Sequence, residues 1–158
     1  MWRFLWIAVV VFISDQLTKF VAADYLLRHG EVKLAPFFSL TLVHNTGAAF
    51  GILSSASGWQ NFFFIFITSV ACIVILSVIW RLDAKNILLV IGLMLVLGGA
   101  MGNLFDRLIH GYVVDFIDFY FHSWHWPAFN MADSAITIGA LLLVLDALGL
   151  GSRKTQQF

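Results

Sequence analysis

Long apolar runs dominate this 158-residue chain, and shorter stretches rich in polar and aromatic residues separate them. About 20 mostly apolar residues cross the hydrocarbon core of a bilayer, and a helix satisfies its own backbone hydrogen bonds there. The pattern predicts four membrane-spanning helices, at about residues 4–22, 60–80, 86–104 and 130–149. We expect one domain over residues 1–158, an all-α integral membrane protein with a small β-containing segment on its outer face.

Two longer segments, about residues 24–59 and 105–129, connect the predicted helices on the face that we expect to be the outer one. Within the first, Phe38–Val43 alternates partly between apolar and polar residues, which predicts a short strand. The second is aromatic throughout, so we expect it to lie at the membrane interface. The six tryptophans of the chain all lie near predicted helix ends, where amphipathic rings prefer the headgroup level.

Composition supports a location in the membrane. Hydrophobic residues make up 61% of the chain and charged residues 11%, whereas a soluble domain carries about 25% charged residues. Nine basic residues balance nine acidic ones, so the basic excess that nucleic-acid binding requires is missing and we expect no nucleic-acid partner. The basic residues are slightly more frequent in the presumed inner segments, which predicts that both termini are cytoplasmic.

The ionisable residues in or beside the predicted helices need an explanation, because charge is costly in a bilayer. Most of them collect toward the outer ends of the first, third and fourth helices. Asp115, in the apolar stretch Val113–Ile117, and Asp133, about one turn inside the fourth helix, can face each other at similar depth. Two close carboxylates in a low dielectric share a proton, so one can activate water while the other polarises a carbonyl. This pair predicts peptide hydrolysis at the membrane edge.

Structural interpretations of the same residues remain open. Asn130 and Asp133 have the spacing of a helix N-cap and an acidic residue in the first turn. Asp115 has Arg107 nearby in the sequence as a partner for a structural ion pair.

Two further spacings predict helix packing. Asp15 and Lys19 are four residues apart with the acid first, which is typical of an ion pair within one helix. The spacing of Gly98 and Gly102 predicts that the third helix packs closely on a neighbour. The polar residues that share one face of that helix are Asn103, Asp106 and Arg107.

Other functions fit parts of the pattern. The acid-rich stretch from Asp106 to Asp118 is faintly similar to the metal motif of CDP-alcohol phosphotransferases, but a further upstream aspartate and a glycine before an Ala-Arg pair are absent. A proton carrier would use the buried aspartates as a relay, yet they gather at one edge and do not line a route across. His122 and His125 are the nearest approach to a zinc motif and have no further ligand at a suitable spacing. We therefore predict no metal and no cofactor.

Four blocks of the sequence are notable together, in this order: Ser14–Lys19, Asn45–Phe50, Gly98–Arg107 followed by Val113–Phe116, and Phe129–Ser134. In this combination they resemble bacterial lipoprotein signal peptidase (signal peptidase II), a family of intramembrane aspartyl proteases. The resemblance extends from about residue 3 to 149, nearly the whole chain.

The resemblance implies an endopeptidase that removes signal peptides from diacylglyceryl-modified prolipoproteins, cutting before the lipidated cysteine. It implies that Asp115 and Asp133 are catalytic. The supporting or substrate-binding residues that it implies are Asp15, Lys19, Asn45, Gly47, Asn103, Arg107 and Asn130. It also implies a multi-pass protein of the bacterial cytoplasmic (inner) membrane, an active site near the outer leaflet, contact with membrane lipid, and inhibition by globomycin-type compounds. We expect Asn45–Phe50 to form part of a cover over the site.

Overall fold

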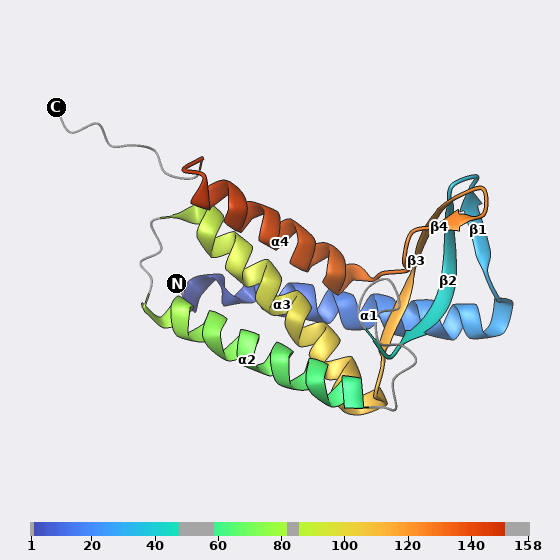
Figure 1. Cartoon of the computed structure of the whole chain (residues 1–158), viewed down its shortest axis with the longest axis horizontal. Coiled ribbons are helices and arrows are strands. Elements are labelled where there is room, and N and C mark those ends of the chain that lie inside the picture. Colours follow the sequence, from blue (N-terminus) through green and yellow to red (C-terminus); the bar gives the residue numbers. More distant parts are fainter. Residues whose placement is uncertain (1, 48–58, 82–85, 151–158) are drawn as a thin grey trace.

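The structure is a computed structural model, and it describes residues 2–47, 59–81 and 86–150. The described residues form long helices and a small antiparallel sheet (Figure 1). The helices are η1 (Trp2–Phe4), α1 (Leu5–His29), α2 (Trp59–Arg81), α3 (Ile87–His110) and α4 (Met131–Ala147). The strands are β1 (Val32–Ala35), β2 (Phe38–Asn45), β3 (Val113–Phe121) and β4 (Trp124–His125).

Each predicted span overlaps one of the α-helices α1 to α4. Three helices within the described residues are long and apolar enough to cross a membrane. These three are Trp2–His29, α2 and α3. The fourth helix, α4, has 17 residues, which is at the lower limit for a spanning helix. A spanning role is therefore supported for three helices and stays a prediction for α4.

Two helices continue further than the sequence predicted, α1 to His29 and α3 to His110. Each ends at a glycine with positive φ, Gly30 at 74° and Gly111 at 81°, a conformation that glycine adopts without strain. The apolar pattern marks the hydrocarbon core, and it does not reveal how far a helix extends beyond it. Because of its extension, α3 carries Arg107 as part of its last turn.

Close approach of backbones holds α3 against its neighbours α1 and α4. A Cβ atom at Gly98 would lie 2.7 Å from the carbonyl oxygen of Ala8, and one at Gly99 would lie 2.4 Å from that of Ala132. At Gly102 it would lie 2.4 Å from Oδ2 of Asp15. The predicted close packing of the third helix is confirmed, and short polar side chains on adjacent helices can consequently reach one another.

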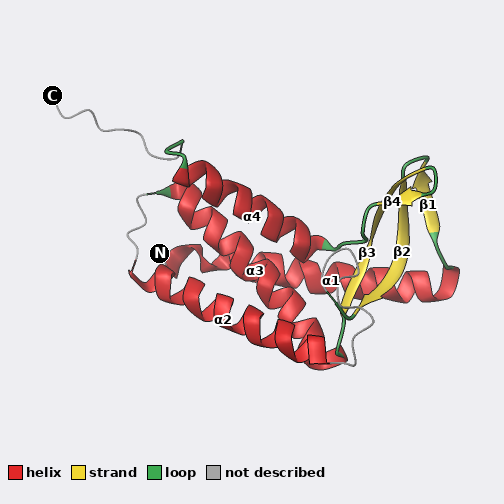
Figure 2. Cartoon of the chain, viewed as in Figure 1, coloured by secondary structure: helices red, strands yellow, loops and turns green. Residues whose placement is uncertain are grey.

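The sheet has the strand order β1-β2-β3-β4, and every neighbouring pair is antiparallel (Figure 2). The strand predicted at Phe38–Val43 is confirmed as part of β2. The prediction for residues 105–129 was incomplete, since this aromatic segment contains β3 and β4. Most of β3 from Val113 to Asp118 is buried, so it lacks the alternation of apolar and polar residues by which a half-exposed strand is recognised.

The sheet lies at one end of the helix bundle, beside the C-terminal part of α1 (Figure 1). The opposite end of the bundle holds η1 and the C-terminal end of α4 (Figure 1). The first turn of α4, the last turns of α3 and the strand β3 therefore meet where the sheet joins the bundle. The predicted site residues come together at this junction.

Candidate active site

Asp115 and Asp133 line one cavity of about 520 Å³ at the junction of sheet and bundle. This volume lies within the range of about 300–1,000 Å³ typical of ligand sites. Asp115 comes from β3 and Asp133 from the first turn of α4. The other predicted site residues that line the cavity are Asn45, Gly47, Asn103 and Arg107.

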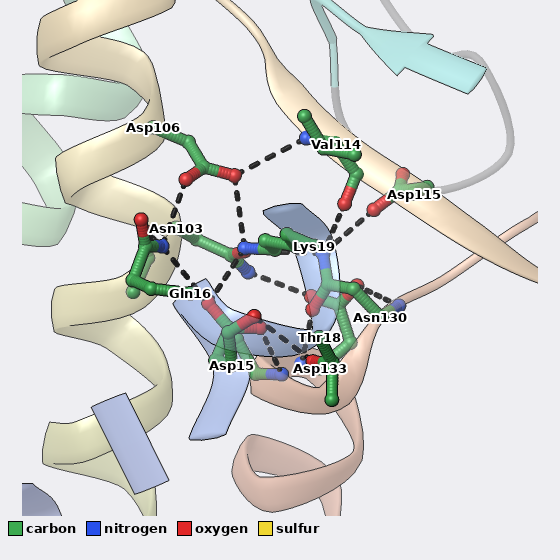
Figure 3. Close-up of polar contacts among 12 residues, drawn as sticks. Asp15, Gln16, Thr18, Lys19, Asn103, Asp106, Val114, Asp115, Asn130 and Asp133 are labelled. Carbon is green, nitrogen blue, oxygen red and sulfur yellow. Dashed lines mark hydrogen bonds and ion pairs between the residues drawn. The ribbon is translucent and has the colours of Figure 1, made fainter. Parts of the chain in front are cut away.

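Asn130 lies between the two aspartates and contacts both (Figure 3). Its side-chain Nδ2 donates to Oδ1 of Asp115 at 2.7 Å, and its backbone N–H donates to Oδ2 of Asp133 at 3.2 Å. Its Oδ1 accepts from the backbone N–H of Asp133 at 2.9 Å, which completes a capping box at the start of α4. The N-cap interpretation is confirmed, and the cap also fixes the position of the Asp133 carboxylate.

Asp115 is 1% exposed and accepts a second hydrogen bond from Nδ2 of Asn45, at 2.9 Å. Burial, and after it the nearby negative charge of Asp133, raise the pKa of Asp115 to about 6. The hydrogen bonds from Asn45 and Asn130 oppose this rise in pKa because they stabilise the charged form.

Arg107 makes other contacts than the ion pair with Asp115 that its sequence position suggested. Its Nη2 donates to the carbonyl of Gly47 at 3.2 Å, and its guanidinium lies 5.0 Å from the ring centre of Phe64. Across the described residues no ion pair joins Arg107 to Asp115, so that structural interpretation is wrong. Arg107 therefore connects α3 to Gly47, which follows β2 and lines the cavity.

A buried cation lies behind the aspartates. Nζ of Lys19 is 2.8 Å from Oδ2 of Asp15, 2.9 Å from Oδ2 of Asp106 and 3.0 Å from Oδ1 of Asn103 (Figure 3). The predicted ion pair between Asp15 and Lys19 is confirmed, but Lys19 is shared with α3. Asp15 also accepts from the backbone N–H of Ala132 at 2.9 Å, which ties α1 to the first turn of α4.

Asn103 connects Lys19 to Asp133 through the two ends of its side-chain amide. Its Oδ1 faces two donors, Nζ of Lys19 and Nδ2 of Asn130. Its Nδ2 must therefore point the other way, where it donates to Oδ1 of Asp133 at 2.7 Å. Lys19 thus fixes which end of the Asn103 amide meets the aspartate.

Sequence reasoning did not include Asp106 and Gln16 among the site residues. Asp106 is 2% exposed, and it accepts from Nε2 of Gln16 at 2.9 Å and from the backbone N–H of Val114 at 3.2 Å. It therefore links α3 to β3 directly beside Asp115. The available signal was its spacing of three from Asn103, which places both residues on one helix face.

The part of the expected cover that begins at Ala48 lies outside the described residues. Asn45 and Gly47 are described, and the backbone N–H of Gly47 donates to Oδ1 of Asn45 at 3.0 Å. Among the described residues, no group of three or more His, Cys, Asp or Glu side chains is placed to hold a metal ion.

Residues 7–149 match the family model described as signal peptidase (SPase) II. The chain belongs to the signal peptidase II family. Members are aspartic proteases, and this membership decides against the phosphotransferase and proton-carrier alternatives. The apolar helices agree with a multi-pass protein of the inner membrane.

Individual relatives agree with the assignment to signal peptidase II. The lipoprotein signal peptidase of Alteromonas mediterranea is 46% identical over 98% of this chain and 85% of that protein. That of Burkholderia thailandensis is 48% identical over 90% of this chain and 85% of that protein. A bacterial membrane enzyme solved by the in meso method at 2.3 Å resolution is 35% identical, with a TM-score of 0.83 over 100% of this chain and 94% of that one.

Proposed function

We propose that this signal peptidase II cuts the signal peptide from diacylglyceryl-modified prolipoproteins, before the lipidated cysteine, with Asp115 and Asp133 as its catalytic pair. One observation carries the proposal. Both carboxylates line the same cavity and are held by the same residue, Asn130, through hydrogen bonds of 2.7 and 3.2 Å.

In the proposed reaction the pair holds one proton, on Asp115, because burial and the charge of Asp133 raise the pKa of Asp115 to about 6. Asp133 takes a proton from water while the water oxygen attacks the carbonyl carbon of the peptide bond. Asp115 gives its proton to the carbonyl oxygen, so a neutral tetrahedral intermediate forms. Asp133 then protonates the amide nitrogen, the C–N bond breaks, and one of the two hydroxyl groups of the intermediate returns its proton to Asp115.

The amide groups around the pair act as positioned donors. Asn45 and Asn130 donate to Asp115, and Asn103 donates to Asp133. Lys19 holds the Asn103 amide in this direction, and Asp15 and Asp106 hold Lys19. Such donors favour ionised carboxylates, so they oppose the effect of burial and keep one of the two charged.

The cavity also suits a substrate that arrives from the bilayer. Ile136, Thr137 and Ile138 on α4 line it, and Ile138 is 53% exposed. An apolar wall on the outside of the bundle can receive the acyl chains of a lipidated substrate together with membrane lipid. The proposal includes a site near the outer leaflet of the inner membrane and cytoplasmic termini, as the distribution of basic residues predicts. A globomycin-type inhibitor would occupy the same cavity.

The test is cleavage of a diacylglyceryl-modified prolipoprotein by the purified protein in detergent, with and without a chelator. Asp115→Asn and Asp133→Asn should each abolish cleavage, and the double variant should be hardly worse, because the pair acts as one unit. Asp146→Asn is the matched control, since Asp146 lies on the same helix as Asp133 and contacts Asn86 near the other end of the bundle. Turnover retained in either single variant would remove that residue from the catalytic pair, and loss of activity in chelator would refute a metal-free mechanism.

A further inference from the structure

A second group of buried polar side chains lies on the sheet, apart from the proposed catalytic pair. Asp118 on β3 is 4% exposed. Its Oδ2 accepts from the hydroxyl of Ser39 at 3.0 Å and from Nδ1 of His125 at 2.9 Å. Burial of a carboxylate is unfavourable without such partners. Neither Asp118 nor His125 lines the cavity, so the proposed chemistry leaves this group unexplained.

These side chains join three strands on one face of the sheet. Ser39 on β2 is the direct cross-strand partner of Asp118, and His125 reaches Asp118 from β4. The His125 ring also stacks on that of Tyr120, its own partner on β3, at 5.3 Å between ring centres. Because side chains alternate along a strand, Asp118 points to the face opposite Asp115.

The nearest basic residue along this face on β1 is Lys33, which is the cross-strand partner of Ser39. In the part of the chain that the structure describes, no ion pair joins Lys33 to Asp118. His125 is therefore the basic partner that the structure assigns to Asp118.

The segment directly after His125 forms a wall of the cavity. We call Trp126–Phe129 the wall segment, and all four of its residues line the cavity. Its backbone is attached to β3 by the N–H of Trp126, which donates to Phe119 at 2.7 Å, and by that of Phe129, which donates to Ile117 at 3.1 Å. β4 itself has only 2 residues, so its backbone ladder is short. The contact between His125 and Asp118 anchors the wall segment where it begins.

The chain beyond the wall segment has separate supports. The capping box fixes Asn130 and Asp133. The side chain of Asn103 accepts from Nδ2 of Asn130 and donates to the carboxylate of Asp133. Loosening the start of the wall segment should therefore disturb the shape of the cavity more than the geometry of the aspartates.

We propose that Asp118 and His125 are positioning residues that hold the wall segment against β3 and so determine how tightly the enzyme binds the peptide part of its substrate. The inference rests on the proposed function, because it concerns the binding of the same prolipoprotein. Substitutions of Asp118 and His125 should therefore change KM, whereas substitutions of Asp115 and Asp133 should change kcat.

The experiment compares kcat and KM for prolipoprotein cleavage by the wild type, His125→Ala and His125→Asn, with a melting temperature for each. His125→Ala should raise KM about tenfold, as expected for the loss of one hydrogen bond to a carboxylate, and leave kcat within about twofold. His125→Asn should restore KM, because its amide nitrogen occupies nearly the position of the imidazole Nδ1.

His122→Asn is the matched control on the same hairpin. His122 has a φ of 56°, a conformation that asparagine tolerates. The KM and kcat of the His122→Asn variant should equal those of the wild type. A wild-type KM for His125→Ala, or no improvement with His125→Asn, would overturn the inference. If His125→Ala does not fold, Ser39→Ala is tested in its place, because this variant removes the hydrogen bond from β2 to Asp118. An unchanged KM for Ser39→Ala would also overturn the inference. A wild-type protein that fails to cleave prolipoprotein refutes the proposed function instead, so the two failures are distinguishable.

Discussion

Replacing Asp15 by alanine should separate stability from chemistry in this enzyme. Asp15 is 0% exposed. One of its oxygens lies 2.8 Å from Nζ of Lys19, and the other accepts from the backbone N–H of Ala132 at 2.9 Å. The carboxylate thus joins α1 to the first turn of α4 without touching the proposed reacting atoms.

The size of the effect follows from the groups that lose a partner. An unsatisfied buried donor costs about 1–3 kcal/mol, and removing one member of a buried ion pair costs about 3–5 kcal/mol. The lower range applies here, because Asp106 still lies 2.9 Å from Nζ of Lys19. A loss of about 1–3 kcal/mol corresponds to a fall of about 2–12 °C in Tm for a chain of this size. Some turnover should persist, since Asn103 keeps its contacts with Lys19 and with Asp133.

The assay is a melting temperature in detergent beside a single-turnover cleavage rate, for Asp15→Ala and Asp115→Asn. Asp115→Asn should show the reverse behaviour, with stability largely kept and turnover lost. Asp24→Ala is the matched control, because the Asp24–Arg28 pair has the same spacing on the same helix but side chains that are 52% and 69% exposed, and exposed pairs contribute little. If Asp15→Ala proved fully stable and wholly inactive, Asp15 would belong with the catalytic residues and the two-aspartate mechanism would be wrong.

Three further outcomes are expected. Because the pKa of Asp115 is raised to about 6, the singly protonated pair is lost as pH rises through that value, so kcat/KM should fall about tenfold per pH unit on the alkaline side; a flat profile between about pH 6 and 8 would contradict the assignment of the proton. Gly99→Ala should lower Tm, since its Cβ would lie 2.4 Å from the Ala132 carbonyl oxygen, whereas Met101→Ala at a 43% exposed position should change it little. Reporter fusions after Arg28 and after Tyr120 should be found outside, and a fusion at the C-terminus in the cytoplasm; the opposite pattern would place the site on the wrong side for exported substrates.

The sequence was most informative where polar residues interrupt apolar ones. Asp115 and Asp133 could be paired because a carboxylate in an apolar setting needs a reason, and the strand at Phe38–Val43 because its residues alternate. The strand β3 could not be recognised, since most of its residues from Val113 to Asp118 are buried and show no regular period. The sequence shows Asp106 as part of a polar helix face. Its contact with Lys19 could not be predicted, because it depends on how closely α1 and α3 approach each other.

The contact of Asp118 with Ser39 and His125 was also beyond reach of the sequence. The three residues lie on three different strands, and Ser39 and Asp118 are separated by 79 positions. Only the register of β2 on β3 brings them together. A hydrophobic pattern fixes which face of a strand is buried, and it does not fix which residue of a distant strand lies opposite.

The two proposed catalytic carboxylates belong to different parts of the molecule, Asp115 to the sheet and Asp133 to the helix bundle (Figure 3). The helix bundle by itself contains only one of them, Asp133. The pair is complete only when the strand β3 is docked on the helices. If the pair is catalytic, a chain whose β3 has not yet docked on the helices lacks one of its two carboxylates at the site.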